Sequence, residues 1–346
     1  MKRVYFIFCV CIYALLCNSI SAQEATHVFT AKKTASKVSF AQVLDNFRKD
    51  FSLAPHYSAG LGAGLAFSYT PSGKRVSVIG NIASTGYALL GVQGKHPLKG
   101  GKWEFNHNSY YCFSPVHYWG TGYLNGSDNS NKVTYDKKYL NLRGEFLYHS
   151  GHLYLGPSFG YENIAWDKIE SASYYNLGFT VGYDSRNSAA APSKGVKTIV
   201  SQRYAIGEFG TTSFTFDTYF GVWDGGILAL DLYSEFAYSQ VPWYAMPTIG
   251  GSYRMRGYHI GRYRDNNMVT AQIELRQRVV DPFRAAVWVG AGNVWGRGGA
   301  FSVKHTLPNY GIGVRVKVGG SRTLRFDWGF GEKGQNGFIL GMNEAF

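Results

Sequence analysis

The sequence predicts an all-β fold, a transmembrane antiparallel β-barrel, from three observations. Aromatic residues make up 16% of the 346 residues, and the chain also holds 43 glycines. No segment has 18 consecutive apolar residues, which excludes membrane-spanning helices. Large apolar residues alternate with small or polar ones along most of the chain, as in strands that turn one face to lipid. Aromatic rings then form the interfacial girdles, and glycines allow the strands to curve.

The first 22 residues predict a secretory signal peptide (1–22). Lys2 and Arg3 precede an apolar run that ends at Leu16, and small residues lead up to a cleavage site between Ala22 and Gln23. A large residue at Leu16 argues against lipidation of the cysteine that follows it. Export combined with a membrane barrel indicates the bacterial outer membrane as the location of the mature protein.

Cysteine and charge usage narrow the chemistry further. Cleavage removes three of the four cysteines and leaves Cys112 alone, so neither an intrachain disulfide nor a cysteine metal site is expected. The formal net charge is +13. In a membrane barrel this charge favours outer-membrane lipid as a partner and a charged lumen, rather than nucleic acid.

Residues 23–55 predict a short periplasmic lead-in. Ser39 begins a possible capping box, and apolar residues from Phe40 to Phe51 recur at helical spacing. This pattern indicates an amphipathic helix on the membrane surface or at the barrel mouth. A partly disordered lead-in is the alternative.

Residues 56–346 are predicted to form the barrel. Apolar residues occupy every second position in segments 175–183, 228–236, 312–318 and 324–330, with small, polar or charged residues between them. Bacterial barrels of one chain have an even number of strands, and we find fifteen candidates. The missing strand lies before Ser58 or within 114–137. The candidates are 58–68, 76–85, 87–97, 103–113, 138–148, 152–165, 173–184, 195–206, 211–223, 226–238, 268–279, 283–292, 309–318, 322–331 and 337–346.

One glycine- and arginine-rich stretch, 250–267, interrupts the alternation. Three arginines near one turn require carboxylates or phosphates as neighbours. Paired glycines allow positive φ angles and close approach of the backbone to another surface. A loop folded inward onto the barrel and a solvated surface loop both fit this composition. The residues of interest are Gly250, Gly251, Arg254, Met255, Arg256, Gly257, Tyr258 and Gly261.

Met255-Arg256-Gly257-Tyr258 resembles the hydrophobic-Arg-Gly-aromatic motif of the BamA/TamA family of outer-membrane barrels (the bacterial surface antigen family). The run that starts at Gly261, the strand 272–276 and the turn 182–195 also match. The resemblance implies a barrel of 16 strands, in which this loop joins strands eleven and twelve and lies in the lumen. It also implies Glu274 as a partner of the loop arginine. Asp327 is a second inward carboxylate by alternation.

The sequence departs from the family at Gly290, where the family has an acidic residue that helps to hold the loop. A looser loop is one possible consequence. The last predicted strand contains Gly337 and Gly341, which we expect to loosen the seam between the first and last strands. Phe338 lies in the same strand, and the aromatic Phe346 matches the recognition signal of barrels that are inserted into this membrane.

We predict that the protein is not an enzyme and needs no cofactor. No nucleophile motif, paired histidines at metal spacing or acid near a histidine stands out, so no catalytic or metal residues are assigned. The resemblance implies a role in outer-membrane protein assembly, insertion or polypeptide translocation, with assembly proteins or unfolded clients as partners. Family members that do this carry periplasmic POTRA modules, for which 23–55 has no room. A stand-alone transport pore and a structural accessory subunit are the alternatives.

Overall fold

The computed structural model describes residues 50–346 apart from 59, 72, 99 and 320–321. The predicted signal peptide (1–22) and residues 23–49 of the predicted lead-in lie outside the described residues. The helix expected from Phe40 onward falls almost wholly within that part. Among the described residues, no helix has the length and apolar character that a membrane span requires.

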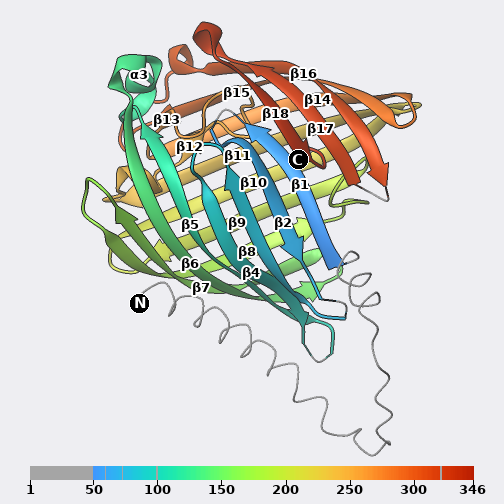
Figure 1. Cartoon of the computed structure of the whole chain (residues 1–346), viewed down its shortest axis with the longest axis horizontal. Helices are drawn as coiled ribbons and strands as arrows, with labels where there is room; N and C mark the ends of the chain where they lie inside the picture. The colour runs from blue at the N-terminus through green and yellow to red at the C-terminus, as the bar shows by residue number, and fades with distance from the viewer. Residues whose placement is uncertain (1–49, 59, 72, 99, 320–321) are drawn as a thin grey trace, which may run out of the picture.

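Sixteen antiparallel strands form a closed barrel, as predicted (Figure 1). Each strand pairs with its neighbour in the chain, except that β11 pairs with β14 and β18 pairs with β1. A separate two-stranded sheet of β12 (Thr248–Ile249) and β13 (Tyr263–Arg264) lies in the connection between β11 and β14. The barrel strands are β1 (Phe51–Ser58), β2 (Gly62–Tyr69), β3 (Val76–Ala83), β4 (Ala88–Pro97), β5 (Trp103–Tyr118), β6 (Val133–Ser150), β7 (Leu153–Trp166), β8 (Ala172–Asp184), β9 (Gly195–Ala205), β10 (Phe209–Trp223), β11 (Gly226–Ser239), β14 (Asn267–Val280), β15 (Phe283–Trp295), β16 (Leu307–Gly319), β17 (Arg322–Phe330) and β18 (Asn336–Met342).

The strands expose their apolar side chains on the outside and bury polar ones inside. In β8 the large side chains of Tyr175, Leu177, Phe179 and Val181 are exposed, whereas Asn176 and Thr180 between them are buried. A closed sheet leaves no backbone group unpaired in lipid, so it can carry apolar residues on its outer surface. The alternation predicted from the sequence is therefore confirmed as apolar outside and polar inside.

The missing strand is β1, which begins at Phe51 and lies before Ser58, the first of the two places expected. Residues 51–55 therefore belong to the barrel and not to the lead-in, which corrects the boundary at 55. Pro55 lies within β1, and proline is tolerated in a strand of which one side has few ladder hydrogen bonds. β1 pairs along its whole length with β2 and through one register pair with β18.

Other strand boundaries differ from the predicted ones because some strands are longer than predicted and one ends earlier. β5 continues to Tyr118 and β6 begins at Val133, so the predicted connection from 114 to 137 shortens. β18 ends at Met342 rather than at 346. Asn343, the next residue, has a positive φ of 65°, which turns the chain out of the strand.

The two ends of the barrel differ in the length of their connections. At one end, strands are joined by short turns such as 151–152, 224–225 and 281–282. The other end carries the long connections 119–132, 240–266 and 296–306, which include α3 (Gly122–Ser127), η1 (Asn129–Asn131), η2 (Trp243–Ala245) and η3 (Val303–His305). Short turns face the periplasm and long loops face the exterior in outer-membrane barrels. We call these the short-turn end and the long-loop end.

The seam between β1 and β18 is the least paired junction in the barrel. One register pair, Tyr57 with Leu340, joins these two strands, whereas seven pairs join β17 to β18. The rings of Tyr57 and Phe338 lie 6.0 Å apart on the outer surface of the seam.

Candidate functional site

The connection 240–266, between β11 and β14, packs against side chains of the barrel strands. Ile249, Met255, Tyr258 and Tyr263 from this connection form a buried cluster with residues of β14, β15 and β16. Met255 has a positive φ of 49°, an uncommon backbone conformation for a residue with a side chain. The cluster fixes the backbone on both sides of Arg256.

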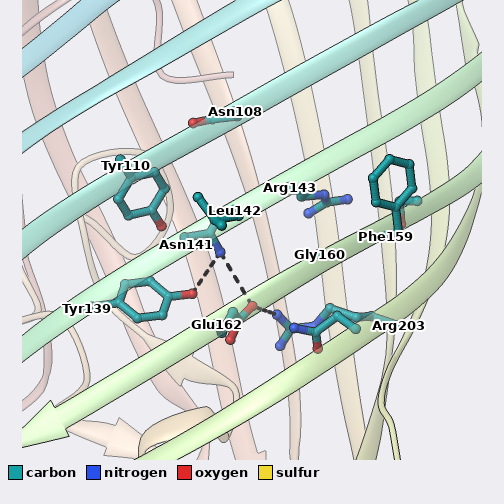
Figure 2. A pocket seen from close by; sticks show the side chains of 12 residues that line it. Asn108, Tyr110, Tyr139, Asn141, Leu142, Arg143, Phe159, Gly160, Glu162 and Arg203 are labelled. Atoms are coloured by element: carbon teal, nitrogen blue, oxygen red, sulfur yellow. Dashed lines mark hydrogen bonds and ion pairs between the residues drawn. The ribbon is translucent and has the colours of Figure 1, made fainter. Parts of the chain in front are cut away.

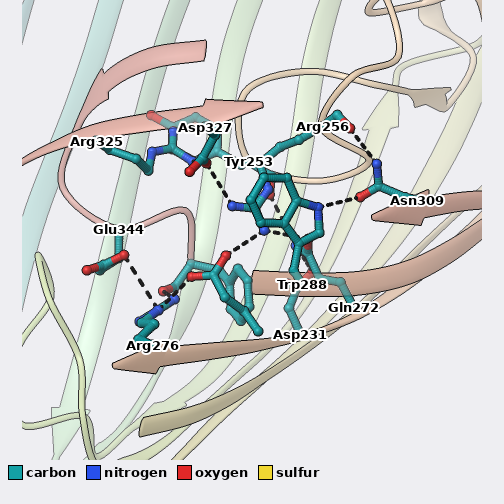
Figure 3. Close-up of polar contacts among 12 residues, drawn as sticks. Asp231, Tyr253, Arg256, Gln272, Arg276, Trp288, Asn309, Arg325, Asp327 and Glu344 are labelled. Carbon is teal, nitrogen blue, oxygen red and sulfur yellow. Dashed lines mark hydrogen bonds and ion pairs between the residues drawn. The ribbon is translucent and has the colours of Figure 1, made fainter. Parts of the chain in front are cut away.

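Arg256 lies at the centre of the site and is fully buried (Figure 3). Its Nη2 atom is 2.5 Å from Glu274 Oε2 on β14, and its Nη1 atom is 2.8 Å from Asp327 Oδ2 on β17. The guanidinium carbon lies 3.6 Å from the centre of the Trp288 ring, in a cation–π contact. One loop side chain thus joins strands β14, β15 and β17.

The backbone beside Arg256 approaches β17 too closely for any side chain. Gly257 has a φ of 104°, and a Cβ atom on it would lie 2.5 Å from the backbone of Gly329. A Cβ atom on Gly329 would in turn lie 2.2 Å from the Arg256 carbonyl oxygen. Asn309 on β16 donates a hydrogen bond to that same carbonyl. Tyr258 then donates from its hydroxyl to the Pro308 carbonyl at 2.6 Å.

A larger charged cluster surrounds the Arg256 pairs. Arg276 Nε lies 2.7 Å from Glu274 Oε1, and Arg315 contacts Glu274, Asp327 and Glu344. Arg325 Nη1 lies 3.1 Å from Asp327 Oδ2. The cluster therefore holds four guanidinium groups and three carboxylates, all of them buried. Such a group is stable only where each charge has opposite neighbours at hydrogen-bonding distance.

A second arginine of the loop, Arg254, binds a different pair of carboxylates. It forms two hydrogen bonds of 2.8 and 2.6 Å with Asp231 Oδ1 on β11, and its Nη2 lies 3.9 Å from Asp217 on β10. The Asp231 carboxylate also accepts from Gln272, which accepts from Arg256. The two loop arginines thus contact one continuous polar network across β10, β11, β14 and β17.

The backbone conformation of the loop explains why the remaining predicted positions are glycines. Gly250 and Gly251 have φ angles of 105° and 132°, and a Cβ on Gly250 would meet the His259 carbonyl at 2.7 Å. Gly261 has a φ of 77° and lies against the Arg264 guanidinium. Gly250 and Gly261 require glycine because they combine positive φ with close packing, and Gly251 favours glycine by its positive φ.

Gly290, the departure from the family pattern, pairs with Gln272 across β14 and β15. A Cβ atom there would lie 2.6 Å from the Ala271 carbonyl. No carboxylate occupies this place, and Arg256 binds Glu274 and Asp327 instead.

The residues predicted in the last strand differ in where the structure places them. Phe338 faces outward at the seam and Gly337 is buried within β18. A Cβ on Gly341 would lie 3.3 Å from Arg325, so this glycine makes room for the charged cluster. Phe346 lies beyond the end of β18, contrary to the strand predicted to reach 346. Its ring lies 5.2 Å from the Arg276 guanidinium carbon.

The segment that follows β18, residues 343–346, is held against the inside of the barrel. Glu344 Oε2 lies 2.7 Å from Arg315 Nε and 3.5 Å from Arg276 Nε. The Glu344 amide donates to the Ala190 carbonyl in the turn after β8, and Arg276 Nη1 donates to the Pro192 carbonyl in the same turn. We call residues 343–346 the inner tether, because its buried contacts hold the end of β18 from inside.

Burial changes the acidity of two groups in the connection 240–266. Burial lowers the pKa of His259, and the nearby cations Lys132 and Arg262 lower it further. Burial also lowers the pKa of Arg264 to about 10, since its guanidinium donates to the carbonyls of Gly261 and Trp243 rather than to a carboxylate. Both groups lie at the long-loop end, where desolvation of the charged form is not offset by a partner.

The wall of β5 to β9 lines a polar cavity of about 260 Å³ (Figure 2). Arg203 Nη1 lies 2.6 Å from Glu162 Oε1, and Asn141 donates to the Tyr139 hydroxyl at 3.0 Å. The β14–β18 wall, by contrast, is packed by the loop and the inner tether. Among the described residues, no group of three or more His, Cys, Asp or Glu side chains is placed to hold a metal ion.

Sequence reasoning named Arg256, Glu274 and Asp327 but missed most of the cluster. The missing members are Arg276, Arg315, Arg325 and Glu344, and the neighbouring contacts of the loop arginines with Asp231 and Trp288 were missed as well. Charged residues at alternate positions of 312–318 and 324–330 were the available signal for Arg315 and Arg325. No local pattern indicated that Glu344 turns inward, since this depends on the end of β18.

Comparison with known proteins now identifies the family. A family model described as the Omp85 superfamily domain matches residues 117–346. No curated protein sequence matches the chain. BamA from Haemophilus ducreyi, lacking POTRA domains 1–3, has a similar structure with a TM-score of 0.64 and 14% identity, over 85% of this chain and 70% of that one.

Two further solved structures are similar. CdiB from Acinetobacter baumannii has a TM-score of 0.58 and 15% identity, over 85% of this chain and 59% of that chain. CdiB from Escherichia coli has a TM-score of 0.59 and 11% identity, over 85% and 63% of the two chains. At these identities the structural likeness shows the fold, and the fold supports outer-membrane localisation. The match to the family model covers most of the chain, which therefore belongs to the Omp85 superfamily.

Proposed function

We propose that this barrel, which is not an enzyme, inserts or assembles outer-membrane proteins, or translocates a polypeptide, by opening the seam between β1 and β18. It does so with other outer-membrane assembly proteins or with unfolded clients as partners. Membership of the Omp85 superfamily supports this class of activity. The observation that carries the proposal is the single register pair, Tyr57 with Leu340, that closes the seam.

The sparse pairing of β1 with β18 makes these two strands the easiest neighbours in the barrel to separate. Opening it costs few ladder hydrogen bonds, whereas the β1–β2 junction holds eight register pairs. An opened β1 edge presents unpaired N–H and C=O groups, which form a template for an incoming strand. The incoming strand would gain main-chain hydrogen bonds while remaining at the lipid boundary.

The inward loop supports the same mechanism because it stiffens the rest of the wall. Arg256 and Arg254 connect β10, β11, β14 and β17 through buried charges. Removing a partner from a buried ion pair costs on the order of 3–5 kcal/mol, so this part of the wall resists opening. Deformation is then concentrated at the seam.

The experiment is a reversible lock across the seam. Cysteines replacing Tyr57 and Leu340 occupy partner positions in the ladder, at a Cα separation that a disulfide can span. A matched control places cysteines at Leu65 and Ile82, which are partners across β2 and β3 and face outward as well.

We expect oxidation of the seam pair to reduce the levels of outer-membrane proteins in cells, and reduction to restore them. The oxidised control pair should leave those levels unchanged. An oxidised seam pair that has no effect on any outer-membrane protein would refute the proposal.

A transport pore is the second candidate, and the polar cavity of β5 to β9 favours it. A pore that needs no seam opening should conduct ions in planar bilayers whether the seam pair is oxidised or reduced. Large, open conductance of the locked barrel would therefore support the pore.

A further inference from the structure

Exposed charges are distributed unevenly between the two ends of the barrel. At the long-loop end, exposed cations such as Lys132, Lys168 and Lys333 are balanced by exposed carboxylates such as Asp128 and Glu170. At the short-turn end, the described part of the chain exposes Asp224 and Asp281 as its carboxylates, and Asp224 binds Arg278. Exposed cations at this end that form no ion pair with another described residue include Lys74, Arg75, Lys95, Lys102, Lys317 and Arg322.

Exposed apolar side chains lie beside two of these cations. The turn from β14 to β15 exposes Val279, Val280 and Phe283, with exposed fractions of 67, 62 and 47%. β16 pairs with β15 through Phe283 and Val316, and the Lys317 amide donates to the Pro282 carbonyl at 3.0 Å. Lys317 therefore lies next to this apolar turn.

The same arrangement continues on the next strand. Val318, which is 54% exposed, follows Lys317, and Arg322 pairs with Gly319 across β16 and β17. Val279, Phe283, Val318 and Arg322 all lie in the outward rows of their strands, which higher up carry Ile273, Val287 and Ile312. We call Val279, Val280, Phe283, Val318, Lys317 and Arg322 the headgroup patch.

We propose that the headgroup patch binds the phosphate of an anionic phospholipid in the periplasmic leaflet. This inference rests on the outer-membrane placement in the proposed function. The apolar side chains continue the lipid-facing surface and contact the upper part of the acyl chains. Arg322 lies where that surface ends, at the level where phosphates lie, and long basic side chains reach headgroups from such positions. Lys317 is at the same level but in the inward row of β16, opposite the buried Thr323, so it lies at the rim of the barrel.

A lipid fits the patch better than a periplasmic protein does. Val279, Phe283 and Val318 belong to rows whose apolar side chains are exposed to lipid higher up the strands. A protein partner would instead be expected to cover apolar residues that point down from the barrel mouth. The cations without ion pairs supply the charge complement for an anionic headgroup.

The test measures lipid retention by the full-length barrel. Purified protein is reconstituted in vesicles of phosphatidylethanolamine and phosphatidylglycerol, extracted gently, and examined by native mass spectrometry. The variant carries Lys317→Gln with Arg322→Gln. The control carries Lys138→Gln with Lys304→Gln, two exposed cations at the long-loop end that form no ion pair. The gel-mobility shift on boiling checks that each variant is folded.

We expect the wild type to retain phosphatidylglycerol in preference to phosphatidylethanolamine. The patch variant should lose about fivefold of that preference, since Arg322 is its one basic residue in an outward row and a basic residue near the surface contributes about this factor. The control should behave as the wild type. Millimolar inorganic phosphate should not displace the lipid, and displacement would show a free-anion site instead.

Equal retention of the two lipids by wild type, or the same preference in wild type and patch variant, would overturn the proposal. Loss of a co-purifying periplasmic protein from the patch variant, with lipid preference intact, would also overturn it and assign the patch to a protein partner. The seam lock tests a different part of the molecule, so its failure would be distinguished from failure here.

Discussion

Replacing Arg256 by methionine should release the inward loop, and the size of the effect follows from the charged cluster. The side chain is fully buried and loses contacts of 2.5 Å to Glu274 and 2.8 Å to Asp327. Both carboxylates keep other arginines, so we expect the low end of the range for a broken buried pair, about 3 kcal/mol. That free energy corresponds to roughly a 100-fold larger open population of the loop.

Replacing Glu274 by glutamine should cost more than replacing Arg256. The cluster holds four guanidinium groups and three carboxylates. Loss of Arg256 leaves three guanidinium groups and three carboxylates, so the buried charges balance. Loss of the Glu274 charge leaves four guanidinium groups and two carboxylates, a buried excess of two positive charges. We therefore expect Glu274→Gln to cost about 5 kcal/mol, the upper end for a buried pair.

The assay is chymotrypsin cleavage after Tyr258, whose side chain is 2% exposed and becomes accessible when the loop opens. Arg278→Met is the matched control, because Arg278 pairs with Asp224 in the open at 2.9 Å. It should change cleavage little, since exposed pairs contribute little to stability. Equal cleavage of Arg256→Met and Arg278→Met would refute the buried anchor. A larger effect for Arg256→Met than for Glu274→Gln would refute the argument from charge balance.

Three further outcomes are expected. Gly329→Ala should raise loop cleavage because its Cβ would lie 2.2 Å from the Arg256 carbonyl, whereas Gly221→Ala, with open space around it, should not. The folded-state pKa of His259 is lowered, so its neutral form is favoured and its contribution to loop stability is lost as the pH falls below the unfolded value of about 6.5. Cleavage should therefore rise between pH 7 and pH 5, and His259→Phe should flatten that rise. Glu344→Ala should increase amide exchange in β18 relative to β8, measured by mass spectrometry, and unchanged exchange would argue against the inner tether.

The sequence predicted the barrel because lipid forces one face of each strand to be apolar, which leaves a period of two in Tyr175, Leu177 and Phe179. Arg256 and Glu274 were predicted from a family resemblance, not from periodicity. The wider cluster escaped prediction because it depends on register. Arg276, Arg315 and Arg325 converge through pairings among β14 to β17. The missing strand was expected before Ser58 or within 114–137, and the sequence alone did not decide between these places; it is β1.

The inner tether gives the two sides of the seam unequal freedom. Glu344 binds Arg315 and Arg276 from within the wall, and the Asn343 amide donates to the Thr323 carbonyl on β17 at 2.6 Å. β18 is thus fastened both to its neighbour and to the interior, while β1 is held by β2 alone beyond its one pairing with β18. In the proposed opening of the seam, we therefore expect β1 to move and β18 to stay in place.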